Sequence, residues 1–267
     1  MSTPAFAQQA RRLALEMVNR VDASHIGGSL SMADLLAVLY NGAMNLRPGE
    51  PRWPERDRFI LSKGHCCSIL YATLALRGFF PMEELLTFGR DGSRLMTHIS
   101  HKVPGVEFST GSLGHGLPFA CGKALSAKRR GQSWRVFAML SDGELDEGSN
   151  WEAILFAPHH RLDNLTLIID YNKIQSLGNV SDVLELHPLA EKFRAFRWAV
   201  REVDGHDHDA IRAALAELPL EPGKPSCLIA HTTKGKGVEF MENQLAWHYR
   251  SPKGELLDQA LAELCKP

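Results

Sequence analysis

Residues 135–174 read RVFAMLSDGELDEGSNWEAILFAPHHRLDNLTLIIDYNKI, and this stretch decides the fold class. Two short runs of apolar and β-branched residues, Arg135–Leu140 and Leu165–Asp170, flank a segment with a helical pattern, Ser149–Arg161. Strands that are apolar along their whole length are buried on both faces, and a helix between two of them makes a right-handed crossover. The stretch therefore predicts a β-α-β unit of a parallel sheet.

The same alternation continues on both sides of this unit. Three more apolar runs predict strands, at Arg58–Ser62, Trp198–Val203 and Ser226–His231. Helical patterns cover an amphipathic N-terminal segment from Pro4, Cys67–Leu76, Leu117–Arg129, Pro188–Phe196 and Asp207–Glu217. We expect one doubly wound, mainly parallel α/β domain over residues 1–267, with helices on both faces of the sheet. In such sheets the ligand lies beyond the carboxyl ends of the strands, so functional residues should follow each run directly.

The composition argues against several classes of partner. The chain has 267 residues, of which 44% are hydrophobic, and a formal net charge of −1 without a long run of one sign. This balance argues against nucleic acid or an anionic membrane as a partner. The five cysteines are odd in number and form no C-x-x-C pair, which favours a reducing cytosol. Because no stretch approaches the roughly 20 apolar residues of a membrane span, we expect a soluble, cytoplasmic protein.

Two polar residues stand directly after the strands of the β-α-β unit. Asp142 follows the first strand and Asn172 follows the second. Magnesium prefers six oxygen ligands, and these two side chains with the carbonyl of Ile174 would leave positions for diphosphate oxygens. Gly143 would let the backbone approach such a ligand closely. Asp-Gly is also a common turn, and Asn at a strand end is a common cap, so these residues alone leave both interpretations open.

The longer stretch SDGELDEGSNWEAILFAPHHRLDNLTLIIDYNKIQSLG, from Ser141, resembles the thiamine diphosphate motif of the transketolase family. That motif opens with GDG and closes at an asparagine. The resemblance implies thiamine diphosphate with Mg²⁺, for which Ca²⁺ or Mn²⁺ could substitute. It implies metal ligation by Asp142, Asn172 and the Ile174 carbonyl. It also implies a diphosphate contact at Gly143 and supporting polar groups at Glu147 and Asp170.

Two positions in this stretch depart from the family pattern. Ser141 replaces the first glycine, which adds a hydroxyl beside the expected phosphate site. Pro158 falls inside the expected helix, so we expect that helix to kink or end near Ala157.

Four further segments resemble the histidine loops of the same family. They are SHIGG from Ser24, DRFILSKGHCCSILYA from Asp57, THISHKVPGVEFSTGSLGHG from Thr97, and HTTKGKGVEFMENQLAWHYRSP from His231. The resemblance implies catalytic histidines at His25, His65, His98 and His248, of which His65 also contacts the cofactor, and backbone contacts to the aminopyrimidine at Gly111 and Leu113. Tyr249 stands where the family usually has glycine. Without the resemblance, each histidine would more often be an ordinary surface or core residue.

The expected chemistry explains why imidazoles would gather around this cofactor. The cofactor supplies the electron sink, and the protein supplies binding and proton transfer. Imidazoles can donate to or accept from sugar hydroxyls near neutral pH. Our hypothesis is that His65, His98 and His248 hold the donor ketose, and that His25 contacts the acceptor side. A further histidine-rich segment, DGHDHDAIRAAL from Asp204, is most simply a turn followed by a capped helix, without chemistry.

The resemblance covers only the diphosphate-binding domain of a full-length transketolase. The glutamate that activates the aminopyrimidine, the aromatic residues against its ring and the basic groups that read a sugar phosphate belong to later domains of the family. We therefore expect a C-terminal transketolase subunit, carrying the pyrimidine-binding and C-terminal domains, as partner in a two-plus-two heterotetramer. The expected reaction is transfer of a two-carbon ketol unit from a ketose, such as a ketose phosphate, to an aldose.

Two other functions remain open at this point. One is a subunit of another thiamine diphosphate enzyme, either a 2-oxo acid dehydrogenase or a relative of deoxyxylulose-phosphate synthase. The other is a non-catalytic subunit that stabilises its partner. The segments HHRLDNL, DYNKIQ and KGKG favour transketolase over the first alternative. The presence of Asp142, Asn172 and the four histidines argues against the second.

Overall fold

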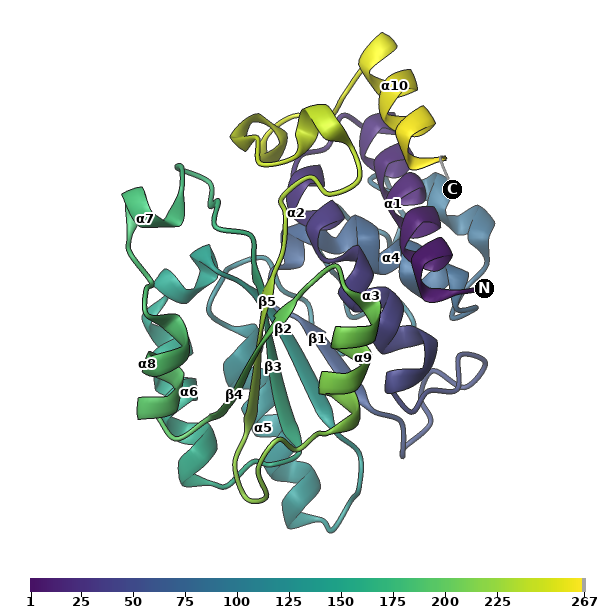
Figure 1. Cartoon of the computed structure of the whole chain (residues 1–267). Coiled ribbons are helices and arrows are strands. Elements are labelled where there is room, and N and C mark those ends of the chain that lie inside the picture. Colours follow the sequence, from purple (N-terminus) through teal and green to yellow (C-terminus); the bar gives the residue numbers. More distant parts are fainter. Residues whose placement is uncertain (266–267) are drawn as a thin grey trace.

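The computed structural model describes residues 1–265 and places the five predicted strands in one sheet (Figure 1). The strands are β1 (Arg58–Leu61), β2 (Val136–Ser141), β3 (Leu165–Tyr171), β4 (Ala199–Asp204) and β5 (Ser226–His231). Their order is β1-β2-β3-β5-β4, and every neighbouring pair is parallel. Each predicted strand is confirmed, and no strand end differs from its prediction by more than one residue.

Helices fill the connections between the strands. They are α1 (Thr3–Arg20), α2 (Ile26–Ser31), α3 (Ala33–Val38), α4 (Cys67–Leu76), α5 (Gly116–Arg129), α6 (Gly148–His159), α7 (Val180–Val183), α8 (Leu189–Ala195), α9 (His208–Ala216) and α10 (Glu255–Leu264). Short 3₁₀ turns occupy Gly64–Cys66, Met82–Thr87, Gly143–Asp146, Glu239–Met241 and Leu245–His248, and a π-helical turn occupies Leu39–Ala43. The predicted helices are confirmed. The loop expected after His25 is instead the helix α2.

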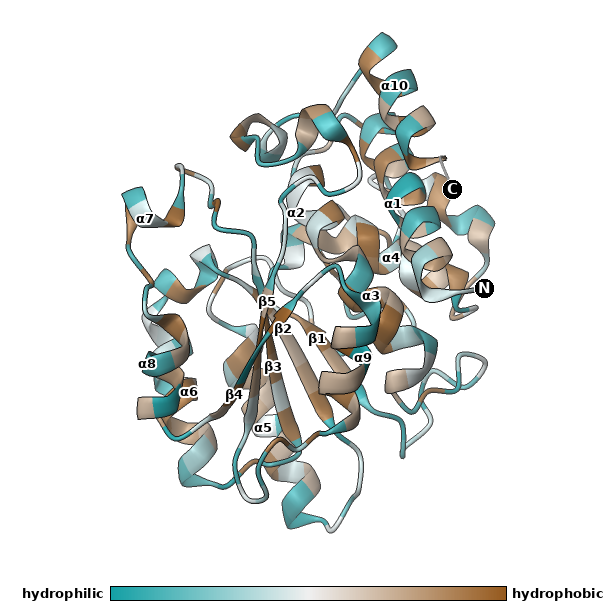
Figure 2. Cartoon of the chain, viewed as in Figure 1, coloured by the Kyte–Doolittle hydropathy of each residue, from teal (hydrophilic) through white to brown (hydrophobic). Residues whose placement is uncertain are grey.

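The sheet separates two hydrophobic cores, as the doubly wound prediction requires. Successive residues of a strand point to opposite faces, so Phe137 and Met139 enter one core while Val136, Ala138 and Leu140 enter the other. Helices α1 to α4 and α9 cover the first face, and α5, α6 and α8 cover the second (Figure 1). The central strands are accordingly apolar (Figure 2).

The edge strand β4 carries charged residues, which is how sheets commonly discourage further pairing at an open edge. Four of the five free cysteines (Cys66, Cys67, Cys121 and Cys227) are buried, and Cys265 is exposed. No helix within residues 1–265 is long and apolar enough to cross a membrane.

Helix α6 continues past Pro158 and ends at His159, two residues beyond the expected end near Ala157. Proline has no backbone N–H, so Pro158 leaves the carbonyl of Ile154 without its helical donor. The indole N–H of Trp198 donates to that carbonyl at 2.8 Å. Because Trp198 is buried beside the start of β4, the missing helical hydrogen bond is replaced by a tertiary one.

We expect Trp198→Phe to lower the free energy of unfolding by about 1–3 kcal/mol, because it leaves the buried Ile154 carbonyl unpaired. In a Pro158→Ala background the alanine N–H can donate to that carbonyl, so the same substitution should cost less. Urea unfolding of the four proteins measures this coupling. An equal cost in both backgrounds would contradict the replacement of one donor by the other.

Candidate cofactor site

The ends of β2 and β3 bring the predicted metal ligands side by side. Ser141 lies opposite Asp170 in the register of the two strands, so Asp142 and Asn172 leave the sheet at neighbouring positions. Both side chains face an open cavity of about 240 Å³ at the carboxyl edge of the sheet. Its lining comprises His25, Gly28, Lys63, His65, His98, Gly111, Leu113, Ser141, Asp142, Gly143, Asn172, Ile174, Gln175, Ser176, Lys234 and His248.

Two predicted site residues do not line this cavity. Glu147 is exposed at the start of α6, and Asp170 is fully buried behind the cavity. The buried glutamate of this segment is Glu144, which accepts hydrogen bonds from the Ser62 hydroxyl at 2.5 Å and the Gly114 amide at 3.0 Å. Glu144 therefore fixes the end of the loop that leads into α5.

Asp142 has the electrostatic character of a cation ligand. Burial and the nearby charge of Asp170 raise the pKa of Asp142 to about 6. Its carboxylate accepts hydrogen bonds from the backbone amides of Gly143, at 2.8 Å, and Lys173. A buried carboxylate beside a second carboxylate is stabilised in its charged form by a bound cation. The side chain thus fits a divalent metal ion.

The other two expected ligands are neutral oxygens. Asn172 Oδ1 accepts a hydrogen bond from the Ile174 amide at 3.2 Å, and the Ile174 carbonyl accepts one from Lys234 at 3.2 Å. Each oxygen has a second lone pair. One carboxylate, one amide oxygen and one carbonyl match the hard oxygen ligands that Mg²⁺ prefers. Within residues 1–265 no group of three or more His, Cys, Asp or Glu side chains is placed to hold a metal ion, so a metal here would depend on one carboxylate together with neutral oxygens.

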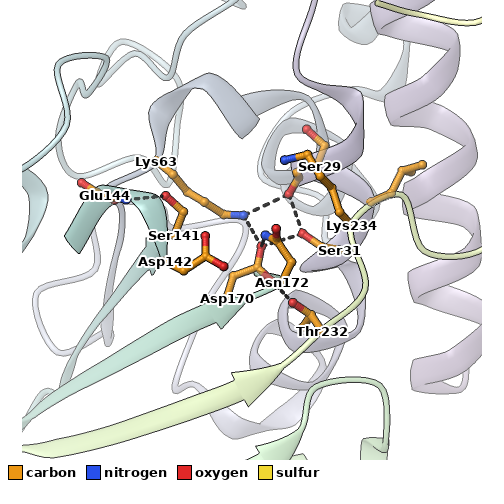
Figure 3. Close-up of polar contacts among 12 residues, drawn as sticks. Ser29, Ser31, Lys63, Ser141, Asp142, Glu144, Asp170, Asn172, Thr232 and Lys234 are labelled. Carbon is orange, nitrogen blue, oxygen red and sulfur yellow. Dashed lines mark hydrogen bonds and ion pairs between the residues drawn. The ribbon is translucent and has the colours of Figure 1, made fainter. Parts of the chain in front are cut away.

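A buried ion pair supports the floor of the cavity (Figure 3). Lys63, two residues after β1, donates to the Asp170 carboxylate and, at 3.0 Å, to the carbonyl of Gly28. Asp170 also accepts from the hydroxyls of Ser31, at 2.5 Å, and Thr232. Burial alone would raise the pKa of Asp170, but the charge of Lys63 and these hydrogen bonds hold it below its ordinary value.

A second buried lysine faces the cavity without a carboxylate partner. Lys234 Nζ donates to the Ile174 carbonyl and lies 3.3 Å from Nδ1 of His248. No Asp or Glu of the described chain lies within ion-pair distance of it. Burial lowers the pKa of Lys234, and repulsion from Lys63 adds to this effect. A buried, uncompensated ammonium at the carboxyl ends of parallel strands is suited to a diphosphate.

The sequence prediction missed both lysines, although a signal for them was present. Lys63 follows the strand β1 by two residues, and Lys234 follows β5 by three. The rule that ligands bind at the carboxyl ends of strands applies to these positions as it does to Asp142. Their charges distinguish them from the neighbouring small residues in SKGH and TKGK.

The four predicted histidines converge at the mouth of the cavity. The ring of His25 lies 5.0 Å from His65, 6.1 Å from His98 and 4.9 Å from His248, measured between centroids. His25 adopts a left-handed backbone conformation with φ of 72°, and its amide donates to the carbonyl of His248 at 2.9 Å. This backbone bond holds together two residues that are more than 200 positions apart in sequence.

Three of these imidazoles are held in the neutral form. Burial and the charge of Lys234 lower the pKa of His248 to about 3. Burial and neighbouring cations also lower the pKa values of His25 and His65. A neutral imidazole can donate one hydrogen bond and accept another. Nδ1 of His25 is buried without a hydrogen-bond partner in the described chain.

Gly111 and Leu113 border the cavity on a loop that is fixed at its base. The hydroxyl of Thr110 donates to the carbonyl of Leu61 at 2.6 Å. A Cβ added to Gly64 would lie 2.3 Å from the Thr110 carbonyl oxygen, so only glycine permits this close approach. Gly111 itself is exposed. The loop therefore presents its backbone at an open side of the cavity.

Ser141 and Tyr249, the two residues that differ from the glycines of the family pattern, each make a hydrogen bond. The Ser141 hydroxyl accepts a hydrogen bond from the Glu144 amide at 3.2 Å and so caps the turn Gly143–Asp146. The Tyr249 hydroxyl donates to the carbonyl of Ser176 at 2.8 Å. Because Ser176 and His248 both line the cavity, Tyr249 joins two sides of its rim.

Comparison with known proteins gives a consistent result. The sequence matches the family described as "Transketolase, thiamine diphosphate binding domain" over residues 2–260. It is 43% identical to the 6-deoxy-6-sulfo-D-fructose transketolase subunit SqwG of Clostridium sp. (strain MSTE9), over 97% of this chain and 95% of that protein. It is 39% identical to an apulose-4-phosphate transketolase subunit of Phocaeicola vulgatus, over 97% of this chain and 92% of that protein.

Solved structures agree with the sequence comparisons. The transketolase of Campylobacter jejuni superimposes with a TM-score of 0.92 at 31% identity. The match covers 99% of this chain but only 43% of that transketolase chain. The fold described above therefore corresponds to less than half of that transketolase chain.

The lowered histidine pKa values predict that acid destabilises the fold. Between about pH 3 and the ordinary histidine pKa of about 6.5, His248 binds more protons in the unfolded chain than in the folded chain. The stability that the neutral histidines contribute should therefore fall as the pH drops from 7 to 5.5, whereas the contribution of Asp142, whose pKa is raised, changes in the opposite direction. We expect His248→Gln, which cannot titrate, to lose less stability over this interval than the unmodified chain. Urea unfolding at both pH values measures the difference, and equal losses would rule out a neutral His248.

Proposed function

This chain belongs to the transketolase family, and on that premise we propose that it is the diphosphate-binding subunit of a two-chain, thiamine diphosphate-dependent transketolase. The observation that carries the proposal is the cavity at the ends of β2 and β3, where Asp142, Asn172 and Lys234 meet the histidines. The two relatives named as subunits align over more than nine-tenths of their own length. This supports residues 1–267 as one diphosphate-binding domain that acts with a second chain.

The proposed reaction moves a two-carbon ketol unit from a ketose to an aldose. Bound thiamine diphosphate supplies the electron sink for the carbon–carbon bond that breaks. Asp142, Asn172 and the Ile174 carbonyl would hold Mg²⁺, for which Ca²⁺ or Mn²⁺ could substitute. Gly143 and Lys234 would face the diphosphate. Asp170 and Glu147 stay outside this contact set, because one lies behind the cavity and the other lies in solvent.

The histidines would bind the sugar substrate. His65, His98 and His248 would bind the hydroxyls of the donor ketose, and His25 would contact the acceptor. Because His25, His65 and His248 are neutral at pH 7, each can donate to one hydroxyl and accept from another. The same groups can hold or pass a proton at those hydroxyls without adding net charge to the cavity.

The partner would complete the open side of the site. Gly111 and Leu113 offer backbone groups to an aminopyrimidine, but Gly111 is exposed in this chain. We propose that a C-terminal subunit, with the pyrimidine-binding and C-terminal domains, covers this side in a two-plus-two heterotetramer. The relatives are named for a sulfonated and a phosphorylated sugar. We propose a substrate with a terminal phosphate or sulfonate, which basic groups of the partner would bind.

Reconstitution tests the two-chain function. The isolated chain should be inactive on ketose phosphates and sulfonates and should gain ketol transfer when its partner is added. Asp142→Asn should reduce this activity by about 100-fold or more and abolish magnesium-dependent cofactor binding, measured by calorimetry. Asp91→Asn, in an exposed Asp-Gly turn, is the matched control. Full activity of the isolated chain, or pyruvate decarboxylation in place of ketol transfer, would overturn the proposal.

His98→Ala tests the proposed role of His98 in binding the donor sugar. We expect kcat/KM of the reconstituted enzyme to fall by about 100-fold or more, because the group that binds the donor hydroxyl is lost. Cofactor affinity should stay unchanged. His101→Ala is the control, since His101 belongs to the same loop and contacts Ser109 outside the cavity. Unchanged turnover of the His98 variant with normal cofactor binding would remove His98 from the catalytic set.

A further inference from the structure

A charged cluster outside the cavity joins Arg11 of α1 and Asp34 of α3 to two histidines of the segment DGHDHD, for which the sequence indicated no chemistry. Asp34, in α3, accepts two hydrogen bonds from the guanidinium of Arg11, at 3.0 and 2.5 Å. Nδ1 of His206 lies 2.7 Å from the same carboxylate, and Nε2 of His208 lies 3.1 Å from it. Although burial opposes ionisation, these hydrogen bonds and the charge of Arg11 hold the pKa of Asp34 well below its ordinary range.

The hydrogen bonds of His206 define its tautomer. The ionised Asp34 carboxylate can only accept, so Nδ1 of His206 carries the hydrogen. The backbone amide of Thr233 donates to Nε2 of His206 at 2.9 Å, so Nε2 is the acceptor. His206 is therefore a neutral imidazole that links a buried carboxylate to a backbone N–H. A carboxylate that orients a histidine in this way fixes both its ring and its tautomer.

Thr233 directly precedes Lys234, the buried cation of the cavity. His206 and Thr233 stand two residues past the ends of the neighbouring strands β4 and β5. The Gly205 amide extends the ladder by donating to the His231 carbonyl at 2.8 Å. A Cβ on Gly205 would lie 2.4 Å from Cγ2 of Thr232. The close approach of the two loops therefore depends on glycine at position 205.

Besides the local turn bonds from the Lys236 and Val238 amides, three hydrogen bonds tie the backbone of residues 233–235 to other parts of the chain. The Gly235 amide donates to the Gly27 carbonyl at 2.9 Å, and the Asn243 amide donates to the Lys234 carbonyl at 2.9 Å. The third is the bond from Thr233 to His206. The first two join backbone groups, so the third is the one that a side-chain substitution removes.

We propose that His206, oriented by Asp34, is a positioning residue that sets the backbone from which Lys234 reaches the diphosphate. This inference rests on the proposed function, in which Lys234 faces the diphosphate. His206 does not line the cavity and acts through Thr233. The ammonium of Lys234 is placed within 3.2 Å of the Ile174 carbonyl, beside the expected metal. A shift of its backbone moves that charge relative to the bound anion, which weakens binding.

Two variants separate the two bonds of His206. Asparagine carries its amide at the position of Nδ1, so His206→Asn can still donate to Asp34 but cannot reach Thr233. Glutamine reaches the position of Nε2, so His206→Gln can still accept from Thr233. His208→Asn is the reciprocal control, because it loses a bond to Asp34 and leaves the bond between His206 and Thr233 intact.

The probe is inorganic pyrophosphate with Mg²⁺, titrated by calorimetry into the full chain. We expect His206→Asn to raise the Kd by about tenfold, and His206→Gln and His208→Asn to change it by less than about threefold. In a Lys234→Ala background His206→Asn should have no further effect, because the group that it positions is gone. Hydrogen exchange of the amides of residues 232–237 should accelerate in His206→Asn and not in His206→Gln.

The outcomes distinguish the inference from the function on which it rests. Equal losses in His206→Asn and His208→Asn, or additive losses with Lys234→Ala, would overturn the positioning role while leaving the diphosphate site in place. Unchanged exchange of residues 232–237 in His206→Asn would overturn it as well. If the unmodified chain failed to bind magnesium pyrophosphate, the proposed function itself would be contradicted, and with it the role of Lys234.

Discussion

The buried charge of Asp170 is the constraint on which the rest of the site depends. Its carboxylate is completely removed from solvent, and an isolated charge in that position would be strongly destabilising. It is compensated by the Lys63 ammonium, the hydroxyls of Ser31 and Thr232, and the amide of Asn172 at 3.4 Å. These partners come from α2 and from the ends of β1, β3 and β5. Satisfying one charge therefore assembles four separate segments at the carboxyl edge of the sheet.

The distribution of charge around Asp170 explains why the cavity suits a metal diphosphate. Lys63 is paired with Asp170, whereas Lys234 has no carboxylate partner within the described residues. Asp142 is buried with a raised pKa, so its charged form is favoured when a cation binds. A metal ion would compensate Asp142, and a diphosphate would compensate Lys234. His25, His65 and His248 at the mouth stay neutral and leave this balance undisturbed.

The sequence was sufficient for those features that depend on local pattern. Apolar runs located all five strands, and the end-of-strand rule located Asp142 and Asn172. It was not sufficient to predict that Glu147 is exposed and Asp170 fully buried, because a family motif does not say which of its carboxylates is exposed or buried. The interaction of His206 with Thr233 could not be predicted from the sequence either. It requires β4 beside β5, and the order β3-β5-β4 is set by packing between segments distant in sequence.

The central claim is that this chain supplies the metal and diphosphate half of a cofactor site that a second chain completes. A crystal structure of the reconstituted complex with thiamine diphosphate and Mg²⁺ tests it most directly. The account predicts the metal on Asp142, Asn172 and the Ile174 carbonyl, the diphosphate beside Lys234, and the aminopyrimidine between Gly111 and residues of the partner. A cofactor held entirely within this chain, or bound away from the ends of β2 and β3, would contradict it.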